Sequence, residues 1–139
     1  YQEAMARGKP VFGLETPMEQ MSLFDSFSKS DQIALLKDTL EHMDEIPRMF
    51  ADLKAAYLDR DLARLVKLSN DSMPDNNPGL VDDLNRKLIV ERNHRMVERM
   101  LPLLKEGQQF IAVGALHLPG EQGLLQLLND QGYSVTVVY

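Results

Sequence analysis

Hydrophobic residues recur along the chain at two different intervals, which predict helices through the middle and short strands near the two ends. Across 17–105 they return every three or four positions, as they do on the buried face of a helix. At 9–14, 109–113 and 134–138 they form short apolar runs close to Gly or Pro, as buried strands do. The pattern therefore predicts a strand, a long helical middle and a closing strand–helix–strand unit over 109–138.

The first helix has a strong start signal. Thr16 can act as the N-cap, Pro17 suits the first helical position, and Glu19 follows the cap by three residues. This arrangement predicts a helix from Pro17 to about Phe27. Ser28 then offers a cap for a second helix, and further helices follow after Pro47 and around 62–68.

A long helix is predicted over 80–105, with a bend near Pro102. Gly107 follows it, as a glycine often follows the end of a helix. The stretch 69–79 before it is polar and rich in turn formers, which predicts a connecting loop. One further helix is predicted over 121–130.

The two terminal strands of the closing unit are separated by one helix, so they should run parallel with a right-handed crossover. We expect an α/β fold with a small parallel or mixed sheet and a large helical insertion. A sheet this small requires more strands beside it. Since residue 1 is not Met, we expect the chain to be the later part of a larger α/β fold. It would complete its sheet by homo-oligomer formation or by pairing with a missing N-terminal half.

Two adjacent polar residues interrupt the apolar face of the long helix. Residues four apart share one face of a helix, and two neighbouring rows of such residues form the apolar face here. Arg92 and Asn93 are the polar residues within these two rows. Burying these groups without partners would cost several kcal/mol, so each must meet an acceptor. One interpretation is structural: Arg92 forms an ion pair and Asn93 holds a loop. The other is that both face a polar cleft that binds substrate.

Polar residues also follow two of the predicted strands. The first strand stops at Glu15, and the second is followed by Gly114 and then His117. Ligands bind beyond the carboxyl ends of parallel strands, so these side chains could share one cleft with Arg92. Gly120 precedes a predicted helix start, where free amide groups favour an anion. Glu and His can bind a divalent metal or act as base and acid, whereas a lone His after a strand is often structural.

The amino-acid composition excludes several classes of protein as candidates. Lys and Arg are not clustered and the net charge is −6, which argues against nucleic acid as a partner. The chain has no cysteine, so thiol chemistry and disulfide scaffolds are excluded. The sequence contains no apolar run of roughly 20 residues that could span a bilayer.

Four sequence segments together resemble the TraB/GumN family, which includes the Tiki proteins, described as metal-dependent proteases. These segments are Gly13-Leu14-Glu15-Thr16, Glu91-Arg92-Asn93, Val113–Gly120 with Gly123-Leu124, and Gly132-Tyr133. The resemblance implies a fold related to the erythromycin-esterase-like and ChaN-like proteins, and an active site with two Gly-x-x-His motifs, a glutamate and a helical Arg-Asn pair.

By position, the resemblance assigns the second Gly-x-x-His motif to Gly114 and His117, the glutamate to Glu15, and the helix pair to Arg92 and Asn93. His117 and Glu15 would then be metal ligands, or one ligand and one base. Arg92, Gly114 and Gly120 would contact substrate, a peptide or small molecule. The metal would be manganese, cobalt or zinc. The resemblance also suggests a bacterial protein located outside the cytoplasm.

The first Gly-x-x-His motif should precede Gly13 and does not occur in this chain. We therefore expect one partial domain over 1–139 with an incomplete metal site, weak metal binding and little hydrolase activity in isolation. The main hypothesis is the later half of a metal-dependent hydrolase, specifically a peptidase. The alternative is a non-catalytic module that binds a small ligand or peptide in the same cleft.

Overall fold

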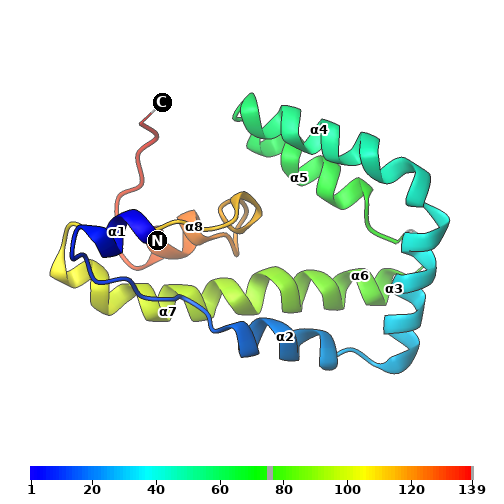
Figure 1. The fold of residues 1–139 in the computed structure, drawn as a ribbon, viewed down its shortest axis with the longest axis horizontal. Coiled ribbons are helices and arrows are strands. Elements are labelled where there is room, and N and C mark those ends of the chain that lie inside the picture. Colours follow the sequence, from blue (N-terminus) through cyan, green and yellow to red (C-terminus); the bar gives the residue numbers. More distant parts are fainter. Residues whose placement is uncertain (75–76, 139) are drawn as a thin grey trace.

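The structure, a computed structural model, describes residues 1–74 and 77–138 and consists of helices joined by irregular segments (Figure 1). The long helices form an open arch around a central hollow. The helices are α1 (Gln2–Ala6), α2 (Pro17–Asp25), α3 (Lys29–Glu41), the 3-10 turn η1 (Met43–Glu45), α4 (Ile46–Leu58), α5 (Leu62–Asp71), α6 (Pro78–Asn85), the π-helical turn η2 (Arg86–Val90), α7 (Glu91–Glu106), the 3-10 turn η3 (Ala115–His117) and α8 (Leu124–Asp130).

One continuous rod, Pro78–Glu106, is the backbone of the arch and comprises α6, η2 and α7. α2 lies along one side of the rod and α8 packs against α7 (Figure 1). At the far end α3 turns away, and α4 and α5 return as a two-helix arm (Ile46–Asp71). The arm reaches back over the rod, where α5 contacts η3.

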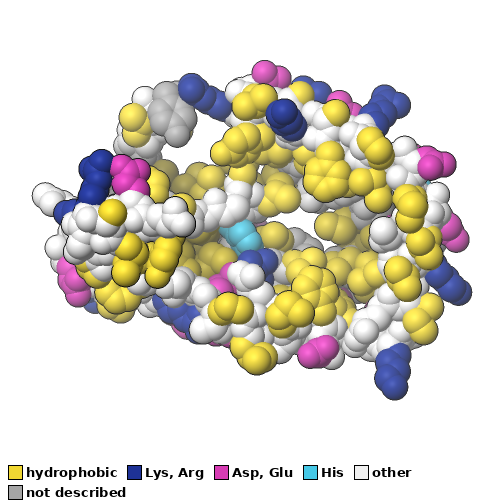
Figure 2. Space-filling view, viewed as in Figure 1, with side chains coloured by type: hydrophobic (Ala, Val, Ile, Leu, Met, Phe, Trp, Pro, Cys, Tyr) yellow, Lys and Arg dark blue, Asp and Glu magenta, His cyan; other side chains and the backbone are white. Residues whose placement is uncertain are grey.

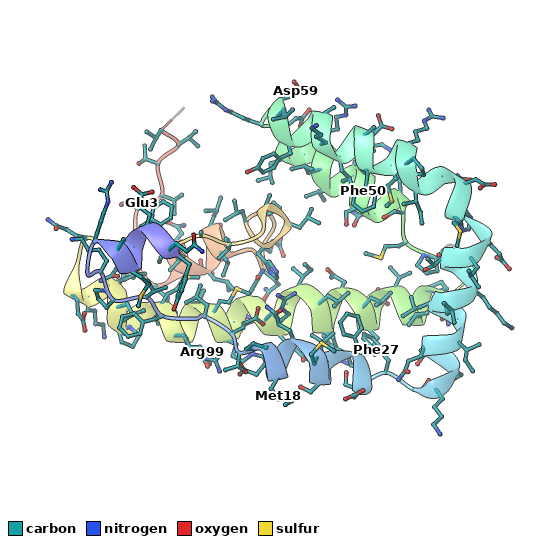
Figure 3. The ribbon with its side chains drawn as sticks, in the orientation of Figure 1. Glu3, Met18, Phe27, Phe50, Asp59 and Arg99 are labelled. Carbon is teal, nitrogen blue, oxygen red and sulfur yellow. The ribbon has the colours of Figure 1, made fainter. Side chains whose placement is uncertain are left out.

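Two small hydrophobic cores hold these elements to the rod. The first joins α8 to α7 and is formed by Met96, Val97, Met100 and Leu124. The second joins the end of α2 to α6 and is formed by Phe27, Leu80 and Leu84; Figure 3 shows Phe27 there, beside the rod. Each core fixes one of the segments that carry the predicted site residues, because Glu15 precedes α2 and His117 precedes α8.

The prediction of an α/β fold is wrong, because residues 1–74 and 77–138 contain no strand or sheet. The three segments predicted as strands, 9–14, 109–113 and 134–138, instead follow irregular paths. A strand requires a neighbouring strand to accept and donate its backbone hydrogen bonds, and an apolar run in the sequence does not supply one. The runs are also not buried: Phe110 is 95% exposed and Val137 is 83% exposed. The predicted parallel strand–helix–strand unit is therefore wrong as well.

The predicted helix starts are confirmed where a cap signals them. The Thr16 hydroxyl accepts a hydrogen bond from the Glu19 backbone N–H, and the Thr16 N–H donates to the Glu19 carboxylate at 2.7 Å. These reciprocal bonds satisfy amide groups that the first helical turn leaves free. Ser28 caps α3 in a similar way, and Gly107, with a φ of 79°, ends α7.

The long helix differs from its prediction in one feature. It passes through Pro102 to Glu106, and its irregularity lies earlier, at the π-helical turn Arg86–Val90. Such wide turns are uncommon and often occur at functional sites. Here the turn immediately precedes Arg92 and Asn93.

Hydrophobic side chains line much of the hollow between the arm and the rod (Figure 2). One of them is Phe50 on the arm, which Figure 3 labels. Within the described residues, no helix combines the length and the hydrophobicity needed to cross a membrane.

Candidate functional site

Asn93 and His117 form the buried centre of the candidate site. Asn93, on α7, is completely buried, and the His117 imidazole is almost so. The His117 Nδ1 and the Asn93 Oδ1 lie 2.6 Å apart. The Asn93 Nδ2 donates to the backbone oxygens of Gln122, at 2.7 Å, and of His117, at 3.3 Å. Asn93 thus joins α7 to the η3 segment with its whole carboxamide.

These bonds determine the protonation of the imidazole. The Asn93 amide nitrogen donates to two carbonyls, so its oxygen must be the acceptor for His117. Nδ1 therefore carries the proton, and the lone pair lies on Nε2. Burial, followed by the positive charge of Arg92, lowers the pKa of His117 below its usual value, while Glu15 opposes this shift. The imidazole is neutral at pH 7 with Nε2 available to a metal or a proton.

Arg92 and Glu15 form the second pair of the site. The Arg92 Nε donates to one carboxylate oxygen of Glu15 at 2.9 Å, and Nη2 donates to the other at 2.8 Å. A third guanidinium nitrogen, Nη1, donates to the Leu88 carbonyl at 3.0 Å. Gln20 also donates to Glu15, at 3.3 Å. This bidentate Arg92–Glu15 ion pair holds the segment before α2 against α7.

Charge and hydrogen bonding keep this pair ionised. The hydrogen bonds from Arg92 lower the pKa of Glu15 and outweigh the opposing effect of burial. The same bonds raise the pKa of Arg92. The Arg92 charge also acts on the pKa of His117, so the two pairs share one electrostatic environment.

The structure therefore brings Glu15 to Arg92 and Asn93 to His117, and the two pairs adjoin because Arg92 and Asn93 are consecutive residues of α7. The structure also shows the contacts that the structural interpretation expects: Arg92 forms an ion pair, and Asn93 holds the loop that follows η3. Gly114 caps η3, and a Cβ there would meet only the His117 ring at 3.5 Å.

Gly120, with a φ of 87°, lies in the loop before α8. It is separated from the seven-residue α8, which begins only after Gly123.

The neighbouring charged residues take separate roles. Arg99 donates to the Leu14 carbonyl at 2.7 Å and to both carboxylate oxygens of Glu19 (Figure 3 labels Arg99 between α7 and α2). These bonds, with the capping bonds from Thr16, lower the pKa of Glu19 to about 2. His42 lies at the surface, as predicted.

The donor groups fit only part of a metal site. His117 suits a ligand, because Nε2 bonds to no group within 1–74 and 77–138 and Nδ1–H is held by a second residue, a common arrangement around metal-bound imidazoles. Glu15 does not suit a ligand in this state, since Arg92 engages both of its oxygens. No cluster of three or more His, Cys, Asp or Glu side chains that could hold a metal occurs among residues 1–74 and 77–138.

Sequence reasoning missed two features of the site. The Gln122 backbone carbonyl accepts from Asn93, and no side-chain pattern signals a backbone acceptor. Gly123 packs so closely that an added Cβ would lie 2.2 Å from the Pro119 carbonyl oxygen. No signal for this close approach was present in the sequence, because the predicted helix 121–130 included Gly123, whereas α8 begins after it.

Comparison with known proteins identifies the class to which this fold and site belong. The model of the TraB/PrgY/gumN family matches residues 1–137, and the chain belongs to that family. It is also similar to proteins named Metalloprotease TIKI2, with 31% identity over 91 residues to that of Xenopus tropicalis and 33% over 91 residues to that of Danio rerio. Each match covers 60% of this chain but only 17% and 18% of the respective relative. No solved structure matches the chain.

Proposed function

We propose that this chain forms part of a metal-dependent peptide hydrolase and contributes the imidazole of His117 to its active site. The observation that carries the proposal is the buried His117, whose Nδ1–H is held by Asn93, whose Nε2 has no hydrogen-bond partner among the described residues, and whose pKa is lowered by burial. Membership of the TraB/PrgY/gumN family and the similarity to the TIKI2 metalloproteases support the same chemistry.

In this proposal each residue has a separate task. His117 binds a divalent ion such as manganese, cobalt or zinc through Nε2, or accepts a proton there. Asn93 orients the imidazole. Arg92, held in place by Glu15, places a positive charge beside the reacting groups, where it can stabilise developing negative charge. When bound, the ion would lower the pKa of a coordinated water and so supply hydroxide.

A non-catalytic binding module is the second candidate. It is favoured by the engagement of both Glu15 oxygens and by the lack of a three-ligand cluster within the described residues. Metal analysis separates the two: a hydrolase site should lose bound metal in His117→Ala, whereas a binding module should show the same metal content in both forms.

Peptide cleavage provides the direct test. The full-length protein as its gene encodes it would be assayed on a fluorogenic peptide library with Mn²⁺, Co²⁺ or Zn²⁺. We expect metal-dependent cleavage that falls by at least about 100-fold in His117→Ala, the lower range for a general acid or base. His42→Ala, which changes an exposed histidine in the turn between α3 and η1, should retain full activity.

Because His117 is buried, circular dichroism must first establish that the variant folds, and His117→Gln provides a second, polar replacement. The proposal fails if the wild-type protein cleaves no peptide with any of these ions, or if both folded variants remain fully active.

A further inference from the structure

A cavity of about 300 Å³ lies between the arm, the rod and the η3 segment. α5 forms one wall, α6 and η2 form another, and the loop around η3 closes one side. Its lining is mainly aliphatic, and representative wall residues are Val66, Met73, Leu84, Ile89, Leu116 and Pro119. The cavity opens into the hollow that hydrophobic side chains surround in Figure 2.

The cavity adjoins the candidate site through two segments of the chain. Leu88 lines the cavity, and its carbonyl accepts the hydrogen bond from Arg92. Leu116 lines the cavity and immediately precedes His117. A ligand group in the cavity would therefore contact the two segments that lead directly to Arg92 and His117.

The chemistry of the walls selects a neutral, apolar occupant. None of the residues that line the cavity is titratable. Its polar side chains include Asn70 and Asn85, which make no side-chain hydrogen bond to any part of the chain that the structure describes. Their carboxamides can donate to and accept from the amide groups of a peptide backbone.

The size points to one amino-acid side chain. Ligand pockets usually measure about 300–1,000 Å³ and combine apolar walls with a few polar groups. At about 300 Å³ this cavity is at the lower end of that range, too small for a helix and suited to a single large side chain.

We propose that this cavity is a specificity pocket for a large non-polar side chain, such as Leu, Met or Phe, of a peptide substrate. The inference rests on the proposed function, since it assigns the substrate class of the same site. The backbone beside the bound residue would then lie at His117, with Asn70 and Asn85 at the rim of the pocket.

Calorimetric binding of a matched peptide series tests the pocket separately from catalysis. Acetyl-Gly-Gly-X-Gly-Gly-amide peptides, with X as Leu, Phe, Ala or Asp, would be titrated into the full-length protein. We expect the Leu and Phe peptides to bind at least about tenfold more tightly than the Ala peptide, as one methylene can already give that ratio in a hydrophobic pocket. The Asp peptide should bind most weakly.

Two variants fill the pocket from opposite walls: Val81→Phe on α6 and Val66→Phe on α5. Each should reduce the Leu-to-Ala affinity ratio towards one. Val137→Phe makes the same exchange at an exposed position outside the pocket and should leave the ratio unchanged. Using both walls guards against a misfolded variant.

Equal affinities for the Leu and Ala peptides, no detectable binding of either, or an unchanged ratio in both folded pocket variants would overturn the inference. The proposed function fails on a different result, the absence of cleavage. His117→Ala distinguishes the two further, because it should abolish cleavage and retain the Leu-to-Ala binding ratio.

Discussion

The carboxamide of Asn93 makes three hydrogen bonds inside the protein, and all three reach the segment that contains His117 and Gln122. No water is needed to satisfy it, since the side chain is 0% exposed and both of its polar atoms have protein partners. A residue of the same size without polar atoms would leave an imidazole N–H and two carbonyls without this partner.

Replacing Asn93 with Leu should therefore destabilise the protein by at least about 2 kcal/mol, because each buried polar group left unsatisfied costs about 1–3 kcal/mol. Urea unfolding measures the change. Asn129→Leu makes the same exchange at an exposed position of α8 and should change stability by less than about 0.5 kcal/mol. Equal effects of the two substitutions would contradict the assigned role of Asn93.

At this scale the sequence was informative about which residues matter. Arg92 and Asn93 were detectable because polar residues interrupt an otherwise apolar helix face. Their partners were less predictable: Glu15 is 77 positions away from Arg92, and the main acceptor of Asn93 is a backbone carbonyl. The preferred tautomer of His117 follows only from those bonds.

Among the elements, the start of α8 depends on Gly123. A Cβ at this position would lie 2.2 Å from the Pro119 carbonyl oxygen and 2.4 Å from that of Leu118. The neighbouring atoms belong to the backbone, so they cannot move aside as a flexible side chain would. The glycine lets the turn after η3 fold back tightly enough for Leu124 to reach the core of α7.

Gly123→Ala should consequently cost about 1–3 kcal/mol, the usual range for overpacking. Gly79→Ala is the matched control: it lies in α6, and its Cβ would make an ordinary 3.7 Å contact with the Asn77 side chain. Alanine is the better helix former by about 1 kcal/mol, so the control should be neutral or stabilising. Thermal unfolding of both variants compares them, and a neutral Gly123→Ala would refute the steric argument.

Helices were predictable from the sequence and strands were not, for a physical reason. A helix forms its backbone hydrogen bonds within one segment, and capping residues mark its ends in the sequence. Thr16 with Glu19 marks the start of α2, and Gly107 marks the end of α7. A strand depends on a partner far away in the chain, so the apolar run 109–113 alone could not establish one. The widened turn at Arg86–Val90 also left no recognisable pattern in the sequence.

At the scale of the whole molecule, the Glu15–Arg92 pair joins the segment before α2 to α7, next to the bonds from Arg99 to Leu14 and Glu19. The Glu15 side chain is only 5% exposed and that of Arg92 is 19% exposed. Water therefore screens this pair much less than it screens a surface ion pair. Losing either partner would leave the other charge poorly solvated.

A double-mutant cycle with Glu15→Gln and Arg92→Gln should reveal strong coupling. Each single change should cost about 3–5 kcal/mol, as breaking a buried pair does. The double variant should cost about 1–3 kcal/mol less than the sum of the two. The exposed pair Glu3–Arg7, at 78% and 70% exposure, serves as a control and should couple by less than about 1 kcal/mol. Urea unfolding supplies all values, and additive effects at Glu15 and Arg92 would contradict the prediction.

The π-helical turn sets the angle between the two functional faces of the rod. A regular α-helix advances about 100° per residue, and the widened turn accommodates one residue more than a regular turn. Winding Arg86–Val90 as a regular α-helix without changing its length would therefore swing α7 by about that angle relative to α6. The arginine and asparagine would then turn away from the wall formed by Leu84 and its neighbours. Substitutions in that wall would leave Arg92 and Asn93 in their present orientation, whereas loss of the widened turn would separate those two side chains from the wall as a unit.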